Sequence, residues 1–114
     1  MQILIAEDDH STVLLYQYIF SEDDVHVCLN GEDFMMHYDD SYDVLIIDIR
    51  MTVKDGYEVI SFLEGLNNTI PIVVVSACIA YATPDELSKL GDVLIIRKPI
   101  LTSTLRERIV KYIN

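Results

Sequence analysis

Four consecutive apolar residues, Val44 to Ile47, lead directly into the carboxylate of Asp48. The run is short, rich in β-branched side chains and not alternating, which is typical of a strand buried on both faces. Asp48 then lies at the carboxyl end of a buried strand, where open α/β sheets bind their ligands. Because a buried charge is unfavourable unless it is paired or coordinated, Asp48 is the first candidate for a functional residue.

The rest of the chain alternates between short apolar runs and helical patterns. The runs predict strands at residues 3–6, 25–29, 44–47, 72–76 and 93–96. Three- and four-residue spacing predicts helices at about 12–20, 32–38, 57–66 and 84–90, and a last one that begins at a cap of Thr102 or Ser103. Asp9, Ser11 or Thr12 is expected to cap the first helix, and Thr83 the fourth. Strands that alternate with helices in this way predict parallel pairing and a single doubly wound α/β domain.

Size and charge narrow the classes of function. The 114 residues suffice for one domain and are too few for two. Lys and Arg number 8 against 19 Asp and Glu, a formal charge of −11 that would repel nucleic-acid phosphates, so we expect no direct nucleic-acid binding. No apolar run approaches the roughly 18 residues of a membrane span, and the start lacks a basic signal region. We expect a cytoplasmic protein without membrane contact, with basic partners or bound cations.

The cysteines and histidines do not form a recognised metal motif in the sequence. Cys28 and Cys78 lie 50 residues apart in apolar surroundings, which is typical of small buried side chains in a reducing compartment. The three histidines, His10, His26 and His37, show no metal-ligand spacing. His10 follows an acidic turn and is expected at the surface or at the start of the first helix.

Polar residues follow four of the predicted strands: Glu7 and Asp8, then Asp48, Ser76 and Lys98. Since parallel strands share one carboxyl edge, these side chains are expected to lie together. Three carboxylates repel each other unless one is protonated or a cation joins them, and oxygen ligands suit Mg²⁺. A hydroxyl and an ammonium can hold phosphate oxygens, and a carboxylate beside the cation can attack phosphorus to form an acyl phosphate.

The sequence resembles a receiver domain of the two-component response regulators, similar to the stand-alone chemotaxis and sporulation type. Residues 3–9 resemble the first strand and acidic pair of that family. Residues 45–51, with Asp55-Gly56, resemble its phosphoacceptor pattern D-x-x-M-P-x-x-D-G. Residues 73–77 and Lys98-Pro99 resemble its fourth-strand end and its Lys-Pro pair. The resemblance covers the whole chain and implies one receiver domain over residues 1–114, with a flavodoxin-like fold of five βα units and strand order 2-1-3-4-5.

The resemblance also implies a role for each residue of the set. Asp48 would accept a phosphoryl group from a histidine kinase or a histidine phosphotransfer protein. The implied Mg²⁺ ligands are Glu7, Asp8, Asp48 and the backbone carbonyl of Arg50, and the implied phosphoryl contacts are Ser76 and Lys98. Phosphorylation would change protein–protein contacts on the face of the fourth helix, fifth strand and fifth helix, where a downstream target binds. The chain would then be a signalling domain rather than an enzyme. It would either act through protein–protein contact without an output domain of its own or be a piece of a larger protein.

Two positions, Thr52 and Ile95, depart from the family pattern. Thr52 stands where the acceptor loop has proline, which suggests a less rigid loop. Ile95, three residues before Lys98, occupies the position of the aromatic switch residue, and Tyr81 is the candidate substitute. Arg50 and Cys78 lie where family members vary and tune the phosphoryl lifetime. The family's Lys-Pro bond is often cis, a form that an X-Pro bond adopts at small cost.

Other classes of function fit the residues less well. A haloacid-dehalogenase-type phosphatase needs a second Asp two residues after the nucleophile, and Arg50 stands there. A flavodoxin-type cofactor site needs a neutral loop after the first strand, and Glu7-Asp8-Asp9 is anionic. A receiver-like interaction module that works without phosphorylation is the remaining alternative, and the complete acceptor set argues against it.

Overall fold

The computed structural model describes residues 1–77 and 82–114, and within them five parallel strands form one sheet. The strands are β1 (Gln2–Ala6), β2 (Asp24–Cys28), β3 (Val44–Asp48), β4 (Ile72–Ser76) and β5 (Leu94–Arg97). Their order in the sheet is β2-β1-β3-β4-β5. The predicted doubly wound sheet and its strand order are therefore confirmed. Cys78 and Tyr81, which entered two of the predictions, lie outside the described residues.

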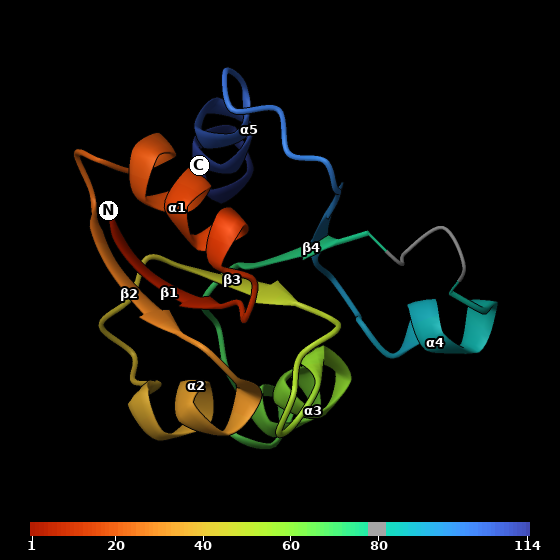
Figure 1. Cartoon of the computed structure of the whole chain (residues 1–114). Helices are drawn as coiled ribbons and strands as arrows, with labels where there is room; N and C mark the ends of the chain where they lie inside the picture. The colour runs from red at the N-terminus through yellow and green to blue at the C-terminus, as the bar shows by residue number, and fades with distance from the viewer. Residues whose placement is uncertain (78–81) are drawn as a thin grey trace.

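Helices cover both faces of the sheet (Figure 1). They are α1 (His10–Ile19), α2 (Gly31–His37), α3 (Gly56–Gly65), α4 (Pro84–Ser88) and α5 (Leu105–Ile113). Figure 1 shows α1 and α5 on one face and α2 and α3 on the other, with α4 beyond the opposite edge from β2. No helix in the described residues is long and apolar enough to cross a membrane.

The central strand β3 is buried along its whole length, as its unbroken apolar run predicts. Its side chains alternate between two apolar clusters. Leu45 and Ile47 join the cluster under α2 and α3, which also holds Phe34 and Leu63. Val44 and Ile46 join the cluster under α1 and α5, which is built from Ile3, Ile5, Tyr16, Phe20, Val73, Val75, Ile96, Leu105 and Ile109 among others. Burial on both faces holds Asp48 rigidly at the end of this strand.

Local capping signals set most helix starts. The Asp9 carboxylate accepts a hydrogen bond from the backbone N–H of Thr12 at 3.0 Å and so caps α1. Thr83 and Glu86 form the reciprocal capping box of α4. The predicted cap of the last helix by Thr102 or Ser103 is wrong: α5 begins after Thr104, which makes no side-chain capping bond.

A close approach of the α3 start to the end of β3 requires glycine at position 56. The Gly56 backbone N–H donates to the carbonyl of Ile49 at 2.8 Å. A Cβ atom at position 56 would lie 2.6 Å from Cα of Ile49 and 2.7 Å from the carbonyl oxygen of Asp48. Only glycine permits this contact, which brings α3 against the strand end that carries Asp48.

Candidate functional site

Three carboxylates meet at the carboxyl edge of the sheet. Glu7 follows β1, Asp8 lies beside it, and Asp48 ends β3. One oxygen of each carboxylate lies within 4.8 Å of the others. Glu7 is fully buried and Asp48 is 6% exposed, whereas Asp8 is partly open to solvent. The predicted gathering of acidic strand ends is therefore present in the structure.

Lys98 supplies a positive charge to this cluster. Its Nζ lies 2.9 Å from Oε1 of Glu7 and 3.6 Å from Oδ2 of Asp48. The Lys98 backbone N–H donates to the carbonyl of Ser76 at 3.2 Å, and the Lys98–Pro99 bond is cis. Burial disfavours the ammonium, but the close contact with the Glu7 carboxylate and the charge of Asp48 outweigh it and raise the pKa of Lys98. The lysine thus stays charged at neutral pH.

Asp48 sits in surroundings that resist its negative charge. Burial, followed by the charge of Glu7, raises the pKa of Asp48 to about 7. Lys98 and a hydrogen bond from the backbone of Arg50 act in the opposite direction and lower it. A further cation beside Asp48 would lower the pKa of this carboxyl and favour its ionised form.

The carboxylate set fits a hard divalent cation. Among the described residues, Oε1 of Glu7 is buried and accepts no well-oriented hydrogen bond, although the Lys98 ammonium lies close to it. Asp8 offers its oxygens from a partly open position, and the backbone N–H of Thr52 lies 3.4 Å from one of them. One or two carboxylates with retained water and a phosphate are the coordination that Mg²⁺ prefers.

A cleft of about 620 Å³ opens beside Asp8 of the acidic cluster. The residues that line it are Asp8, Ile49, Arg50, Met51, Thr52, Asp55, Tyr57, Ser76, Ala82 and Glu86. The Ser76 side chain is buried, 1% exposed, and faces this cleft from the end of β4, whereas Arg50 is exposed at its rim.

Two further residues from the sequence analysis, Ile95 and Asp55, do not belong to the acidic cluster. Ile95 lies on β5, 37% exposed, in a separate hollow with Pro99 and Leu101. Asp55 caps α3 by accepting a hydrogen bond from the backbone N–H of Glu58 at 3.0 Å. The contact of Thr52 with Asp8 was not predicted. It depends on a backbone N–H that proline would lack, so the departure from the proline pattern was the available signal.

The model of the response regulator receiver domain family matches residues 3–110. The transcriptional regulatory protein ZraR of Salmonella typhimurium is 27% identical over 97% of this chain and 26% of its own length. The transcriptional regulatory protein FlgR of Helicobacter pylori is 35% identical over 63% of this chain and 20% of its own length. The chain therefore spans about a quarter or less of these curated relatives.

Solved structures share the fold along almost the whole chain. The Francisella response regulator 1452 receiver domain has a TM-score of 0.82 and 24% identity, and the match covers 98% of this chain and 95% of that one. A DNA-binding response regulator of the LuxR family from Staphylococcus aureus has a TM-score of 0.82 and 25% identity, covering 99% and 98%. The likeness agrees with the arrangement of strands and helices described above.

Proposed function

Since the chain belongs to the response regulator receiver domain family, whose members are two-component signalling modules rather than enzymes, we propose that Asp48 is its phosphoacceptor. The donor is a histidine kinase or a histidine phosphotransfer protein, and the reaction uses Mg²⁺. The product is an acyl phosphate on Asp48 that alters which protein the domain binds. The whole of residues 1–114 acts as this one domain.

The position of Asp48 supports the proposal most directly. The carboxyl is 6% exposed, ends the central strand and lies 3.6 Å from the Lys98 ammonium, with oxygens of Glu7 and Asp8 within 4.8 Å. A carboxylate held between a cation site and a lysine has its reacting oxygen oriented and its charge balanced before a donor arrives.

Each side chain has a separate task in phosphoryl transfer. An oxygen of ionised Asp48 forms the new bond to phosphorus while the phosphorus–nitrogen bond of the donor phosphohistidine breaks and its electron pair stays on the imidazole. Lys98 balances the charge on the phosphoryl oxygens, and the hydroxyl of Ser76 donates a hydrogen bond to one of them. Glu7, Asp8, Asp48 and the backbone carbonyl of Arg50 would hold Mg²⁺, which would neutralise charge on the transferring group.

The signal is proposed to leave through the face of α4, β5 and α5. Among the described residues α4 buries none of its side chains, and Ile95 on the neighbouring β5 is 37% exposed. Movement of the Ser76 region on phosphorylation would change how this open face packs. Isoleucine at position 95 has no polar tip, so the face would respond by repacking rather than by moving a tyrosine hydroxyl between two partners.

Phosphorylation in vitro tests the acceptor. We expect the protein, incubated with Mg²⁺ and a small acyl-phosphate donor, to gain one phosphoryl group by intact-mass measurement. Asp48→Asn removes the nucleophilic oxygen and should abolish the adduct. Asp8→Asn weakens the cation site and should slow adduct formation by at least about tenfold.

Asp55→Asn is the matched control, because asparagine preserves the α3 cap at the neighbouring acidic position. It should be phosphorylated at the wild-type rate. An adduct that persists in Asp48→Asn would place the acceptor elsewhere. A folded protein that never forms an adduct would favour an interaction module that works without phosphorylation.

A further inference from the structure

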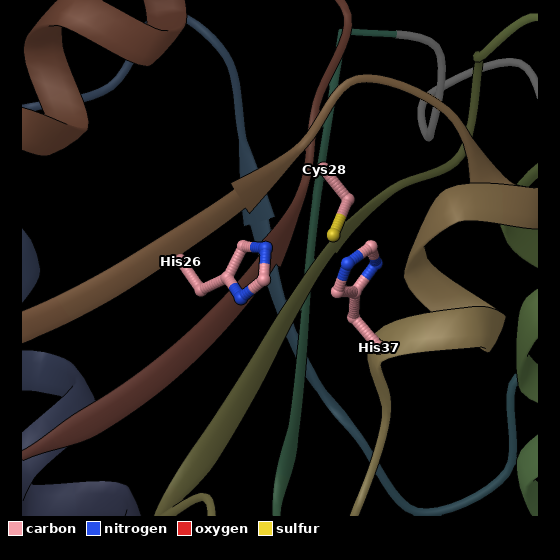
Figure 2. A group of neighbouring side chains, drawn as sticks. All are labelled: His26, Cys28 and His37. Carbon is pink, nitrogen blue, oxygen red and sulfur yellow. The ribbon is translucent and has the colours of Figure 1, made fainter.

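A second group of potential metal ligands consists of residues that do not belong to the acidic cluster. The ring nitrogens of His26 and His37 and the sulfur of Cys28 lie within 4.8 Å of one another. Figure 2 shows the sulfur between the two imidazole rings, with a ring nitrogen of each histidine turned toward it. The ring centroids are 4.6 Å apart. These three residues are called the His–Cys cluster below.

The fold explains why the three side chains meet. His26 and Cys28 are two residues apart on β2, so both point to the same face of the sheet. Cys28 belongs to the apolar cluster under α2 and α3, which places this face beneath α2. His37 is the last residue of α2 and closes the cluster from above. Because β2 is an edge strand, the histidines stay accessible to solvent while Cys28 is buried.

Neighbouring groups orient both histidine rings. Nδ1 of His37 lies 2.8 Å from the backbone carbonyl of Asp33 and 3.1 Å from its carboxylate. A carbonyl only accepts, so Nδ1 carries the proton and Nε2 keeps its lone pair for a metal. The hydroxyl of Tyr42 lies 3.5 Å from Nδ1 of His26 and leaves its Nε2 for the cluster. Metal-binding histidines are held in this way by contacts at the second ring nitrogen.

We propose that His26, Cys28 and His37 form a binding site for Zn²⁺ or a similar transition-metal ion, with water in the fourth position. Two imidazoles and a thiolate are the donors that such ions prefer, in contrast to the all-oxygen set of the acidic site. Ligand atoms around tetrahedral zinc lie about 3.4–3.6 Å apart. The three ligand atoms here lie within 4.8 Å of one another, so side-chain movements of up to roughly 1 Å would complete the geometry.

Two other roles for this cluster fit less well. Burial, followed by the charge of Asp33, raises the pKa of the Cys28 thiol to about 12, so the metal-free cysteine is a poor nucleophile or redox sensor. Packing of the two imidazole rings against each other would not by itself explain why the thiol lies between them and why Asp33 contacts His37. A bound ion would instead cross-link β2 to the end of α2. This site is independent of the phosphoacceptor role of Asp48.

Zinc titration against a chelating indicator, with Mg²⁺ in excess to saturate the acidic site, measures the proposed binding. We expect the full chain to bind one equivalent of Zn²⁺. His26→Gln and His37→Gln should each weaken the affinity at least about tenfold, and Asp33→Asn by a smaller factor. Co²⁺ in place of Zn²⁺ should give a thiolate-to-metal absorption band that disappears in Cys28→Ser.

The chain offers matched controls for each variant. His10→Gln and Cys78→Ser should keep the wild-type affinity for Zn²⁺. Asp8→Asn should keep it as well, because Asp8 does not belong to the His–Cys cluster. His26 and His37 are not buried, so their variants are expected to fold, which thermal unfolding checks. Wild-type affinity in both histidine variants would overturn the proposal. Loss of zinc binding in Asp8→Asn alone would move the ion to the acidic site and overturn it as well.

Discussion

At the scale of single residues, the Asp48 carboxylate is the most strongly perturbed acid near the cleft. Its pKa of about 7 lies above the value of 3.8 for an ordinary aspartate, mainly because of burial and then because of Glu7. Between about pH 4 and pH 7 the folded chain therefore holds a proton that the unfolded chain has lost. The free energy of unfolding must therefore fall as the pH rises from about 4 to about 7.

Asp48→Asn removes this titration, so we expect the variant to be more stable than wild type at pH 8 without Mg²⁺. The gain should be about 1–3 kcal/mol, because one unit of pKa shift corresponds to about 1.4 kcal/mol and Lys98 offsets part of the repulsion. Near pH 4 the two proteins should be equally stable. Urea unfolding in EDTA at both pH values measures this, and an equal gain at both would contradict the assigned pKa shift.

At the scale of elements, two helix starts press directly on the loop that follows β3. The backbone N–H of Glu32 in α2 donates to the carbonyl of Val53 at 3.1 Å, and α3 begins against Ile49. Val53 and Lys54 adopt positive φ angles of 48° and 71°, a conformation that β-branched valine rarely adopts. The loop that follows Asp48 is thus shaped by its contacts with the two helices.

Gly56→Ala should destabilise the protein by about 2 kcal/mol or more, because the new Cβ would overlap Ile49 and the Asp48 carbonyl. The shift needed to relieve the overlap should also slow phosphorylation. Gly65→Ala is the matched control: nothing lies within 4 Å of its added Cβ, so a gain of up to about 0.5 kcal/mol is expected. Equal unfolding midpoints for the two variants would exclude the close approach.

At the scale of the whole molecule, the ion pair between Arg106 and Asp23 joins distant parts of the chain. Arg106 of α5 donates from Nε to Asp23 at 2.9 Å and from Nη2 at 3.0 Å. Asp23 precedes β2, and its side chain is 1% exposed. The hydrogen bonds from Arg106 outweigh burial and lower the pKa of this carboxyl. The pair therefore holds α5 against the edge of the sheet that carries β2.

Arg106→Met should lower the thermal unfolding midpoint at pH 7, because Asp23 would lose its bidentate partner. A carboxyl with a lowered pKa stabilises the fold above its unfolded pKa of 3.8 and loses that contribution as the pH falls through its folded value. The difference between variant and wild type should therefore shrink as the pH falls below 3.8. Arg108→Met, an exposed change two residues on, serves as the control and should leave the midpoint almost unchanged.

The buried strands were the elements that the sequence predicted best, because their apolar runs match their apolar surroundings. Apolar runs buried on both faces predicted β1, β3 and β4 almost to the residue, because short runs rich in β-branched residues are typical of strands between two layers of helices. The outer strands moved: β2 spans Asp24–Cys28 instead of 25–29, and β5 spans Leu94–Arg97 instead of 93–96. An edge strand pairs on one side only, so its ends depend on one neighbour. The weak cap of α5 likewise depends on the path of the preceding loop.

The sequence alone determined the parallel sheet and the set of acidic, hydroxyl and lysine residues at its carboxyl edge. Strands that alternate with helices pair in parallel, and all parallel strands end at the same edge. Only the tertiary structure decided the distances that shift the pKa of Asp48 and the position of Ile95 outside the acidic cluster. It also brought His26, Cys28 and His37 together. The alternation of His26 and Cys28 was visible in the sequence, but the third ligand comes from a helix whose placement depends on packing.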